Sequence, residues 1–217
     1  MSVKKVLSII CVAAAGMAVV SSFAIADASK ESQAPAGLPA DIKLPPGWTM
    51  EDMQACILAA TPGKMHEHLT KEVGTWEGKT TMNMPGSEAL TSDCTMTVKP
   101  LMGGRFTQVE LKGEMPGMGP YEGFGIYGYD NVSKKFVSSW IDNHGTGVMQ
   151  CTGDLSGDGK VMTWSCKFNC PVTKKEVSMR EIDTATGPNT KRFEMFGPDP
   201  KTGKESKMMT IDFTKKG

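Results

Sequence analysis

The chain has 217 residues, enough for one domain that buries a sizeable core. It carries 24 lysines and arginines against 24 aspartates and glutamates, so its formal charge at pH 7 is zero. Because the charges balance and the basic residues form no continuous stripe, the sequence lacks the features of a nucleic-acid-binding surface. We therefore expect no nucleic-acid partner. The 24 glycines and 13 prolines, with abundant threonine, valine and methionine, favour strands and turns, so the predicted class is all-β.

Residues 1–26 have the features of a secretory signal peptide. Two lysines precede an apolar run over residues 6–20, and Ala24 and Ala26 supply the small residues of an A-x-A cleavage site. We predict cleavage after Ala26 and export to the periplasm or the extracellular space, without stable membrane insertion afterwards. An uncleaved anchor is the alternative, because residues 6–26 are just long enough to span a bilayer.

Export changes the expected chemistry of the cysteines. Five of the six follow the predicted cleavage site, and in an oxidising compartment they are disulfide candidates before they are metal ligands or catalytic thiols. Because five is odd, at least one thiol stays free, pairs between chains or binds a ligand. We expect Cys56 to be a buried thiol and Cys170 to reach Cys94, and we assign Cys151 and Cys166 below.

Two segments precede the main domain. Residues 27–46 are rich in Ser, Ala and Pro without periodicity, which predicts a flexible lead. Residues 47–72 are predicted to be a short helical segment. Thr49 and Asp52 form a capping-box pattern, apolar residues recur at helical spacing up to residue 60, and a second helical turn follows.

Two histidines, His66 and His68, lie in that second turn. At positions i and i+2 they point to different sides of a helix, so they cannot chelate one metal ion as an i, i+4 pair does. We expect both to be solvent-facing polar residues.

The remainder, residues 73–217, reads as about ten strands joined by short turns, the pattern of an up-and-down antiparallel barrel. Closure is physically favourable because it removes both edges of the sheet. Residues 113–119 hold too much Gly and Pro for regular structure and are predicted to be a loop. The expected strands cover residues 76–84, 94–99, 105–112, 121–130, 135–142, 149–155, 162–168, 176–183, 191–196 and 206–214.

The central hairpin of this barrel spans residues 121–142. With residues 131–134 as its loop, one face carries three cross-strand pairs. One of them, Gly125 opposite Trp140, leaves room for the indole to lie across the neighbouring strand, because glycine has no side chain. The other two pairs are Tyr129 with Phe136 and Tyr127 with Ser138.

The next hairpin repeats this arrangement. Its Asp-Gly turn at residues 158–159, placed as type I′, sets Gly153 opposite Trp164 and Cys151 opposite Cys166. Directly paired residues lie about 4.5 to 5.5 Å apart at Cα, within disulfide range, so we predict a Cys151–Cys166 bond. Counting from this turn makes the two cysteines a hydrogen-bonded pair, in which side chains are held further apart.

Five motifs follow one another along the predicted strands: G-x-W-x-G at residues 74–78, G-R-F at 104–106, G-x-x-G-Y-D at 125–130, W-I-D-N at 140–143 and F-E-M at 193–195. Together they resemble an uncharacterised, usually exported bacterial family, known only as a domain of unknown function. The resemblance covers Val73 to the C-terminus. That family is similar to calycin and lipocalin-like barrels, so the resemblance implies a fold and brings no activity.

The resemblance also implies how one end of the barrel closes. In calycin barrels the Trp of a G-x-W motif plugs that end, often under a basic side chain from the last strand. Gly74 and Trp76 match the motif, and Lys215 or Lys216 would supply the basic group where an Arg is usual.

Aromatic side chains are the leading candidates for a binding site. A barrel of about ten strands is wide enough to leave a cavity, and aromatic residues facing it bind apolar or flat ligands. We therefore predict a non-catalytic exported protein that binds a small apolar or amphipathic ligand and needs no cofactor. A packed core is the alternative explanation of the same residues. The candidate ligand-binding residues are Tyr127, Tyr129, Trp140, Trp164 and Arg105.

A competing hypothesis places an enzyme or metalloprotein at the rim. Asp142 and His144 follow the central hairpin, and Arg105 and Glu110 come from an adjacent strand. A carboxylate beside a histidine could serve acid-base chemistry or hold a metal ion. The same Asn-His-Gly sequence is also ordinary turn composition, and no nucleophile stands at a recognisable spacing.

The 17 methionines have two alternative explanations. Their thioethers could bind copper in the periplasm, or they could fill an irregular core. A structural envelope protein with a filled barrel is the third functional class. The candidate copper ligands are Met82, Met84, Met115 and Met118. Copper binding would be supported if Met115 and Met118 faced Cys94 or His144 across a cavity.

Overall fold

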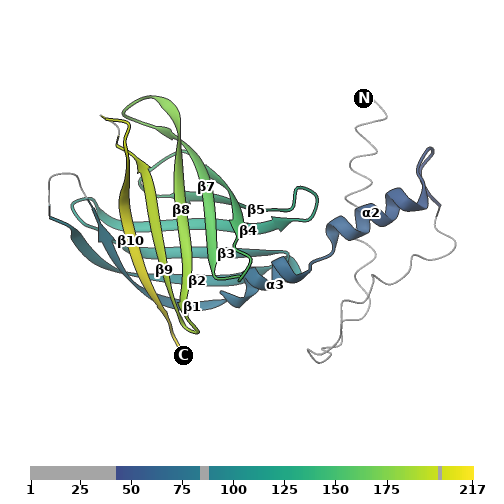
Figure 1. Ribbon diagram of the computed structural model, residues 1–217, viewed down its shortest axis with the longest axis horizontal. Coiled ribbons are helices and arrows are strands. Elements are labelled where there is room, and N and C mark those ends of the chain that lie inside the picture. Colours follow the sequence, from purple (N-terminus) through teal and green to yellow (C-terminus); the bar gives the residue numbers. More distant parts are fainter. Residues whose placement is uncertain (1–42, 84–87, 200–201) are drawn as a thin grey trace. The chain divides into compact units, whose positions relative to one another are not determined.

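A computed structural model of the chain describes residues 43–83, 88–199 and 202–217 (Figure 1). These residues belong to two units, one ending at Thr61 and one beginning at Pro62. The predicted signal peptide lies outside the described residues, as does most of the flexible lead. Within the described ranges, no helix is long and apolar enough to cross a bilayer.

The first unit contains helix α2 (Met50–Ala60). It begins where the sequence predicted, because Thr49 caps it: the Thr49 hydroxyl accepts a hydrogen bond from the backbone N of Asp52 at 3.1 Å, and the Asp52 carboxylate accepts one from the backbone N of Thr49 at 2.8 Å. This reciprocal pair satisfies two backbone donors that the first turn leaves without partners. Cys56 is half-buried on this helix.

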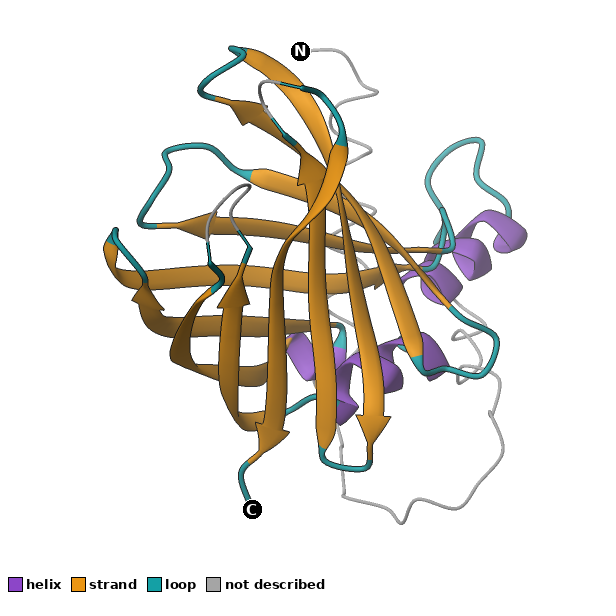
Figure 2. Cartoon of the chain, turned by 60° about the vertical axis from the view of Figure 1, so that its left-hand side comes forward, coloured by secondary structure: helices purple, strands orange, loops and turns teal. Residues whose placement is uncertain are grey.

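The second unit is a closed barrel of ten antiparallel strands, which confirms the predicted all-β up-and-down architecture (Figure 2). Each strand pairs with its neighbour in sequence, and β1 pairs with β10 to complete the ring. The strands are β1 (Gly74–Met82), β2 (Leu90–Leu101), β3 (Phe106–Met115), β4 (Gly119–Asp130), β5 (Lys135–Asp142), β6 (Met149–Leu155), β7 (Val161–Cys170), β8 (Lys175–Gly187), β9 (Thr190–Pro198) and β10 (Glu205–Lys215).

The register of the central hairpin is the predicted one. In β4 and β5, Gly125 pairs with Trp140. The loop over residues 131–134 is held by Asp130, whose carboxylate accepts hydrogen bonds from the backbone N atoms of Val132 and Ser133 at 2.9 and 3.2 Å. An aspartate that binds its own loop in this way fixes the turn and therefore the register of both strands.

The β6–β7 hairpin confirms the predicted pairing but corrects the turn. Its loop covers residues 157–160, and the ladder begins with a hydrogen bond from the backbone N of Ser156 to the carbonyl of Val161 at 2.8 Å. Bonded and non-bonded pairs alternate along an antiparallel ladder, so this start makes Cys151 and Cys166 a non-hydrogen-bonded pair. Their Cα atoms are 4.0 Å apart, and the predicted disulfide is present.

Strands β3 and β4 are longer than predicted. The expected loop over residues 113–119 shrinks to a turn at residues 116–118, because β3 continues to Met115 and β4 starts at Gly119. Gly113 belongs to the strand, where a Cβ would lie 2.8 Å from the carbonyl oxygen of Asp93. Its missing side chain permits close approach of β2, a role for glycine that composition alone does not separate from loop formation.

A short helix, α3 (Lys64–Lys71), lies at the end of the barrel where β1 begins (Figure 1). We call this the closed end, and the end with the β5–β6 loop the open end. The expectation that both histidines of this helix face solvent is wrong for His66, which is 5% exposed. Its Nδ1 accepts a hydrogen bond from the backbone N of Gly63 at 3.0 Å, and its ring meets the Tyr129 ring edge-on at 5.7 Å. His68 is half-buried, with its ring 6.1 Å from that of Phe136.

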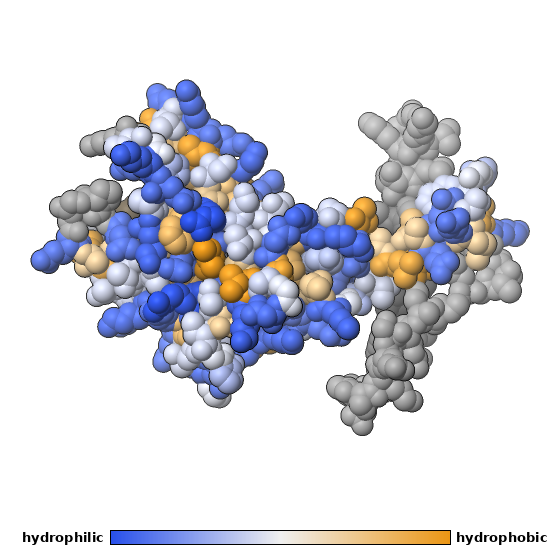
Figure 3. Space-filling view, in the orientation of Figure 1, coloured by the Kyte–Doolittle hydropathy of each residue, from blue (hydrophilic) through white to orange (hydrophobic). Residues whose placement is uncertain are grey.

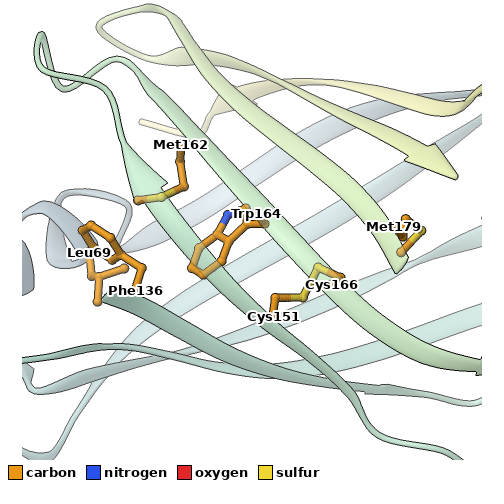
Figure 4. Packing of buried hydrophobic residues seen from close by; sticks show 7 residues of the cluster. All are labelled: Leu69, Phe136, Cys151, Met162, Trp164, Cys166 and Met179. Carbon is orange, nitrogen blue, oxygen red and sulfur yellow. A yellow bond between two sulfur atoms is a disulfide. The ribbon is translucent and has the colours of Figure 1, made fainter. Parts of the chain in front are cut away.

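Apolar side chains gather on the inner wall. One cluster surrounds Trp164, which lies along β7 between Met162 and Cys166 (Figure 4). A second cluster surrounds Trp76 and includes Phe213. The face of the molecule drawn in Figure 3 is mostly hydrophilic with smaller apolar areas, as expected where strands alternate between inward and outward side chains.

Candidate ligand-binding site

The barrel encloses a cavity of about 1080 Å³. Its wall is mainly apolar, with side chains from nearly every strand and from α3. Side chains therefore do not fill the barrel, and a cavity of this size accommodates a drug-sized molecule. Aromatic residues of the wall include Tyr121, Tyr127, Trp140, Trp164, Phe168 and Phe193.

Three of the five predicted ligand-binding residues line this cavity: Tyr127, Trp140 and Trp164. The Tyr127 and Trp164 rings meet edge-on at 5.5 Å, which holds both in place. Tyr129 does not line this cavity and lies at the closed end, with its ring 4.9 Å from that of Phe136.

Arg105, the fifth candidate, lies outside the wall of the cavity, just before β3. It follows the 3₁₀ helix η1 (Met102–Gly104), and its Nη1 donates to the carbonyl oxygen of Met102 at 3.2 Å. It lies near His66, where its charge contributes to lowering the pKa of that imidazole, although burial contributes more. The structure therefore groups Arg105 with α3 at the closed end.

Trp76 lies at the closed end beneath two ammonium groups. Lys215 Nζ and Lys191 Nζ are each 5.3 Å from the centre of a Trp76 ring. The indole Nε1 donates to the carbonyl oxygen of Glu72 at 2.9 Å, and Lys215 Nζ donates to that of Lys71 at 3.1 Å. These bonds tie the first and last strands to the end of α3.

Of the two lysines expected to cover Trp76, only Lys215 does so. Lys215 is the basic residue over Trp76, whereas Lys216 forms an exposed ion pair with Glu77 at 2.6 Å. Gly74 makes room for Lys215, because a Cβ at this position would lie 2.8 Å from its Cε. Gly74 also has φ +137°, a conformation that residues with a side chain rarely adopt.

A buried ion cluster that the sequence reasoning missed lies beside this plug. The Lys191 side chain is 9% exposed, and its ammonium is 2.7 Å from Glu72 Oε2 and 3.0 Å from Asp183 Oδ2. Burial works to lower the pKa of Lys191, but the two carboxylates outweigh it and raise that pKa, so Lys191 stays charged. The cluster thus holds one ammonium group between two carboxyl groups.

Glu181 was also missed, and it has a different environment. It is 5% exposed, lines the cavity, and lies between Trp164 of β7 and Met195 of β9. Its carboxylate makes no hydrogen bond or ion pair with any residue in the described part of the chain. Burial, with a smaller contribution from Asp183, raises its pKa from 4.5 to about 7.

The spacing of residues in β8 indicates that Asp183 and Glu181 face the interior. In β8, every second residue from 177 to 183 points to the same face, so Glu181 and Asp183 share a face with the apolar side chains of Val177 and Met179. An acid in phase with an apolar stripe is expected to face the interior. Only the closed barrel shows that this interior is a cavity.

The rim residues do not converge as the competing hypothesis requires. The Asp142 carboxylate accepts a hydrogen bond from the backbone N of His144 at 2.9 Å and from the Tyr121 hydroxyl at 3.4 Å, so it caps the turn and does not orient the imidazole. His144 Nε2 is 3.2 Å from the carbonyl oxygen of Pro120. Glu110 lies on the outer wall, where it accepts a hydrogen bond from Gln108 at 2.6 Å.

The sulfur-containing candidates are also separated. Met118 is 64% exposed in the β3–β4 turn, and neither it nor Met115 lines the cavity; Met84 lies outside the described residues. Cys94 and Cys170 are free thiols on β2 and β7, so the expected Cys170–Cys94 pair is wrong. Strands β2 and β7 lie far apart in the order of the sheet.

Within the described ranges, one group of side chains has the spacing of a metal site: Cys151, Cys166 and Glu181. Its two sulfur atoms are bonded to each other, which removes the thiolates that would bind a metal ion. Of this group, Glu181 lines the cavity.

Comparisons with known proteins agree with this architecture. A family model described as "Protein of unknown function (DUF1579)" matches residues 61–215. No curated protein matches the chain.

Two solved structures share the fold. The crystal structure of Rv2717c from M. tuberculosis is 14% identical, with a TM-score of 0.52 over 72% of this chain and 100% of its own. The S-type phycobiliprotein lyase CPES from Guillardia theta is 7% identical, with a TM-score of 0.50 over 70% of this chain and 93% of its own. At such identities the likeness extends to the fold alone.

Proposed function

The chain belongs to the DUF1579 family of proteins of unknown function, and from the geometry of its barrel we propose that it is an exported, non-catalytic binding protein. Its ligand is a small apolar or amphipathic molecule held inside the barrel. The observation that carries this proposal is the cavity of about 1080 Å³ with its aromatic and aliphatic wall. Apolar surface of this extent binds apolar molecules through the hydrophobic effect.

Two further observations support the proposal. The Cys151–Cys166 disulfide is typical of proteins in oxidising compartments, which favours export. At the rim, Asp142 and His144 meet through a backbone hydrogen bond and not through the imidazole, which favours binding over acid-base catalysis.

A direct test is native mass spectrometry of the protein purified from its own host. We expect a retained organic mass that is lost on denaturation. A bound metal mass would favour the rim hypothesis, and a bare polypeptide that also binds no apolar dye would favour a structural role.

A pair of tryptophan variants tests whether the ligand occupies the lumen. Leu111 lines the cavity, whereas its neighbour Lys112 is exposed on the outer wall. Leu111→Trp places an indole in the lumen and is expected to weaken binding of an apolar fluorescent dye about tenfold or more, a loss of about 1.4 kcal/mol. Lys112→Trp adds the same group outside and should leave binding unchanged. Equal affinities in the two variants would contradict binding inside the barrel, provided that circular dichroism shows both to be folded.

A further inference from the structure

The inner wall holds more negative than positive charge. Among its buried and half-buried described residues, four carboxylates face one ammonium group, that of Lys191. Because Lys191 is bound between Glu72 and Asp183, it is not available to Glu181. The four carboxylates are those of Glu72, Asp142, Glu181 and Asp183.

Glu181 is the one of these four without a partner from the described part of the chain. The carboxylate of Asp142 accepts two hydrogen bonds at the rim, and Glu72 and Asp183 bind Lys191. The Glu181 carboxylate lies within 4.8 Å of both sulfur atoms of the Cys151–Cys166 disulfide. A buried carboxylate without a partner is unfavourable, and a cation supplied by a ligand removes that penalty.

The neighbours of Glu181 favour a cation for a second reason. The Trp164 side chain lies beside Glu181 on the inner face, and the negative charge of Glu181 contributes, after burial, to raising the pKa of Tyr127. Aromatic faces attract ammonium groups through their quadrupole, most strongly where water is excluded. Carboxylate and aromatic rings together form the lining typical of sites for organic amines.

We propose that the ligand is a cationic amphiphile, an organic amine on an apolar body, and that Glu181 binds its ammonium group while the aromatic and methionine wall holds the apolar part. This inference depends on the proposed function, since it names the chemical class of the molecule in the same cavity. It assigns to Glu181 the role of an anchoring residue that determines specificity.

Binding of an amine to Glu181 is expected to depend on pH. The ammonium pairs with the ionised carboxylate, so affinity rises as pH increases through the pKa of Glu181, which is about 7. A ligand that accepts a hydrogen bond from the neutral acid would show the opposite trend. The other ionisable side chains that face this region are Asp183 on β8, Tyr121 and Tyr127 on β4, Lys191 on β9, Glu72 and His68 at the closed end, and Asp142 and His144 at the rim.

Three decyl compounds with the same chain and different head groups test the proposal on the full-length protein. Decylammonium, decanol and decanoate are titrated below their micellar concentrations, and binding is measured by calorimetry and by tryptophan fluorescence. At about pH 8 we expect decylammonium to bind about tenfold more tightly than decanol, the size of a charge-assisted hydrogen bond. Its dissociation constant should fall between about pH 6 and about pH 8.

Two isosteric variants complete the test. Glu181→Gln removes the anchoring charge and is expected to abolish the preference for decylammonium and its pH dependence, with decanol affinity unchanged. Glu77→Gln removes a carboxylate from the outer wall, changes the net charge equally, and should keep both. Equal binding of the three compounds, tightest binding of decanoate, or an ammonium preference that survives Glu181→Gln would overturn the inference. If no compound binds, the proposed function itself fails; if decanol binds without an ammonium preference, only the role of Glu181 fails.

Discussion

Gly153 lies so close beneath the indole of Trp164 that a Cβ at residue 153 would be 2.6 Å from its Cε3 atom. Gly125 has the same relationship to Trp140, with a distance of 2.5 Å. Real Cβ atoms do not approach other atoms so closely. Each glycine therefore permits an indole to lie across the neighbouring strand and to form part of the cavity wall.

The first prediction tests this close approach. Gly153→Ala should lower the free energy of unfolding by about 1 to 3 kcal/mol, because the methyl group overpacks against Trp164. Chemical denaturation followed by fluorescence measures the change. Gly157→Ala is the control, because its Cβ would meet nothing within 4 Å in the β6–β7 loop, and its effect should stay within about 0.5 kcal/mol. A Gly153→Ala protein as stable as the wild type would show that the indole moves away at no cost.

The fold was predictable from sequence because local signals agree with each other. Turn residues such as Asp130 set the register, and that register places apolar residues on one face and polar ones on the other. The β6–β7 loop shows the limit of this reasoning. The observed loop is longer than the predicted one, yet Cys151 still pairs with Cys166. The longer loop makes them a non-hydrogen-bonded pair where a hydrogen-bonded pair was predicted, and counting residues from the turn does not distinguish the two cases.

The site was less predictable than the fold. Tyr127 and Trp164 could each be placed on one face of its own hairpin, because alternation within a hairpin is a local property. The sequence did not show whether that face lines a cavity or a packed core. Lys191 and Asp183 lie on the neighbouring strands β9 and β8, but Glu72 follows α3, far away in the sequence, and only barrel closure brings it to Lys191. The position of Arg105 near α3 was not predictable either, because the sequence does not show which end of the barrel this residue occupies.

The second prediction concerns the disulfide. Reduction of Cys151–Cys166, which closes a loop with a sequence separation of 15, should lower the free energy of unfolding by about 3 kcal/mol. Urea denaturation with and without a phosphine reductant measures the effect. In the Cys94→Ala protein the reductant should act equally strongly, because Cys94 is a free thiol. Identical midpoints for the oxidised and reduced wild type would contradict the expected stabilisation.

The third prediction concerns the buried ion cluster. Lys191→Met removes the ammonium group and leaves two carboxylates without their cation, so we expect a loss of about 3 to 5 kcal/mol in unfolding free energy. Lys216→Met is the matched control: it breaks the exposed pair with Glu77 and should cost no more than about 1 kcal/mol. Adding Asp183→Asn to Lys191→Met should recover part of the loss. Similar effects of the two lysine variants would show that burial does not strengthen the cluster.

The fourth prediction uses the pKa of Glu181, which burial raises from 4.5 to about 7. The folded protein holds this proton more tightly than the unfolded chain, so the acid favours folding most at low pH and loses that contribution as pH rises from about 4.5 to about 7. Glu181→Gln should therefore stabilise the protein by up to about 3 kcal/mol above pH 7, relative to its effect near pH 4.

Urea unfolding of this variant at several pH values measures the difference from the wild type. Glu77→Gln, exposed on the outer wall, should show no such trend. If the stability difference between Glu181→Gln and the wild type were the same at all pH values, the carboxyl would have to titrate normally.

The order of strands also has a consequence during synthesis. Nine of the ten strand pairings join strands that follow one another in the sequence. The tenth joins β1 to β10, and next to it the backbone N of Lys216 donates a hydrogen bond to the carbonyl of Thr75. Hairpins can therefore form as the chain emerges, but the ring stays open until its last strand, of eleven residues, has left the ribosome. A guest molecule can be enclosed only after that final step, so a chain truncated before β10 would have hairpins and no interior.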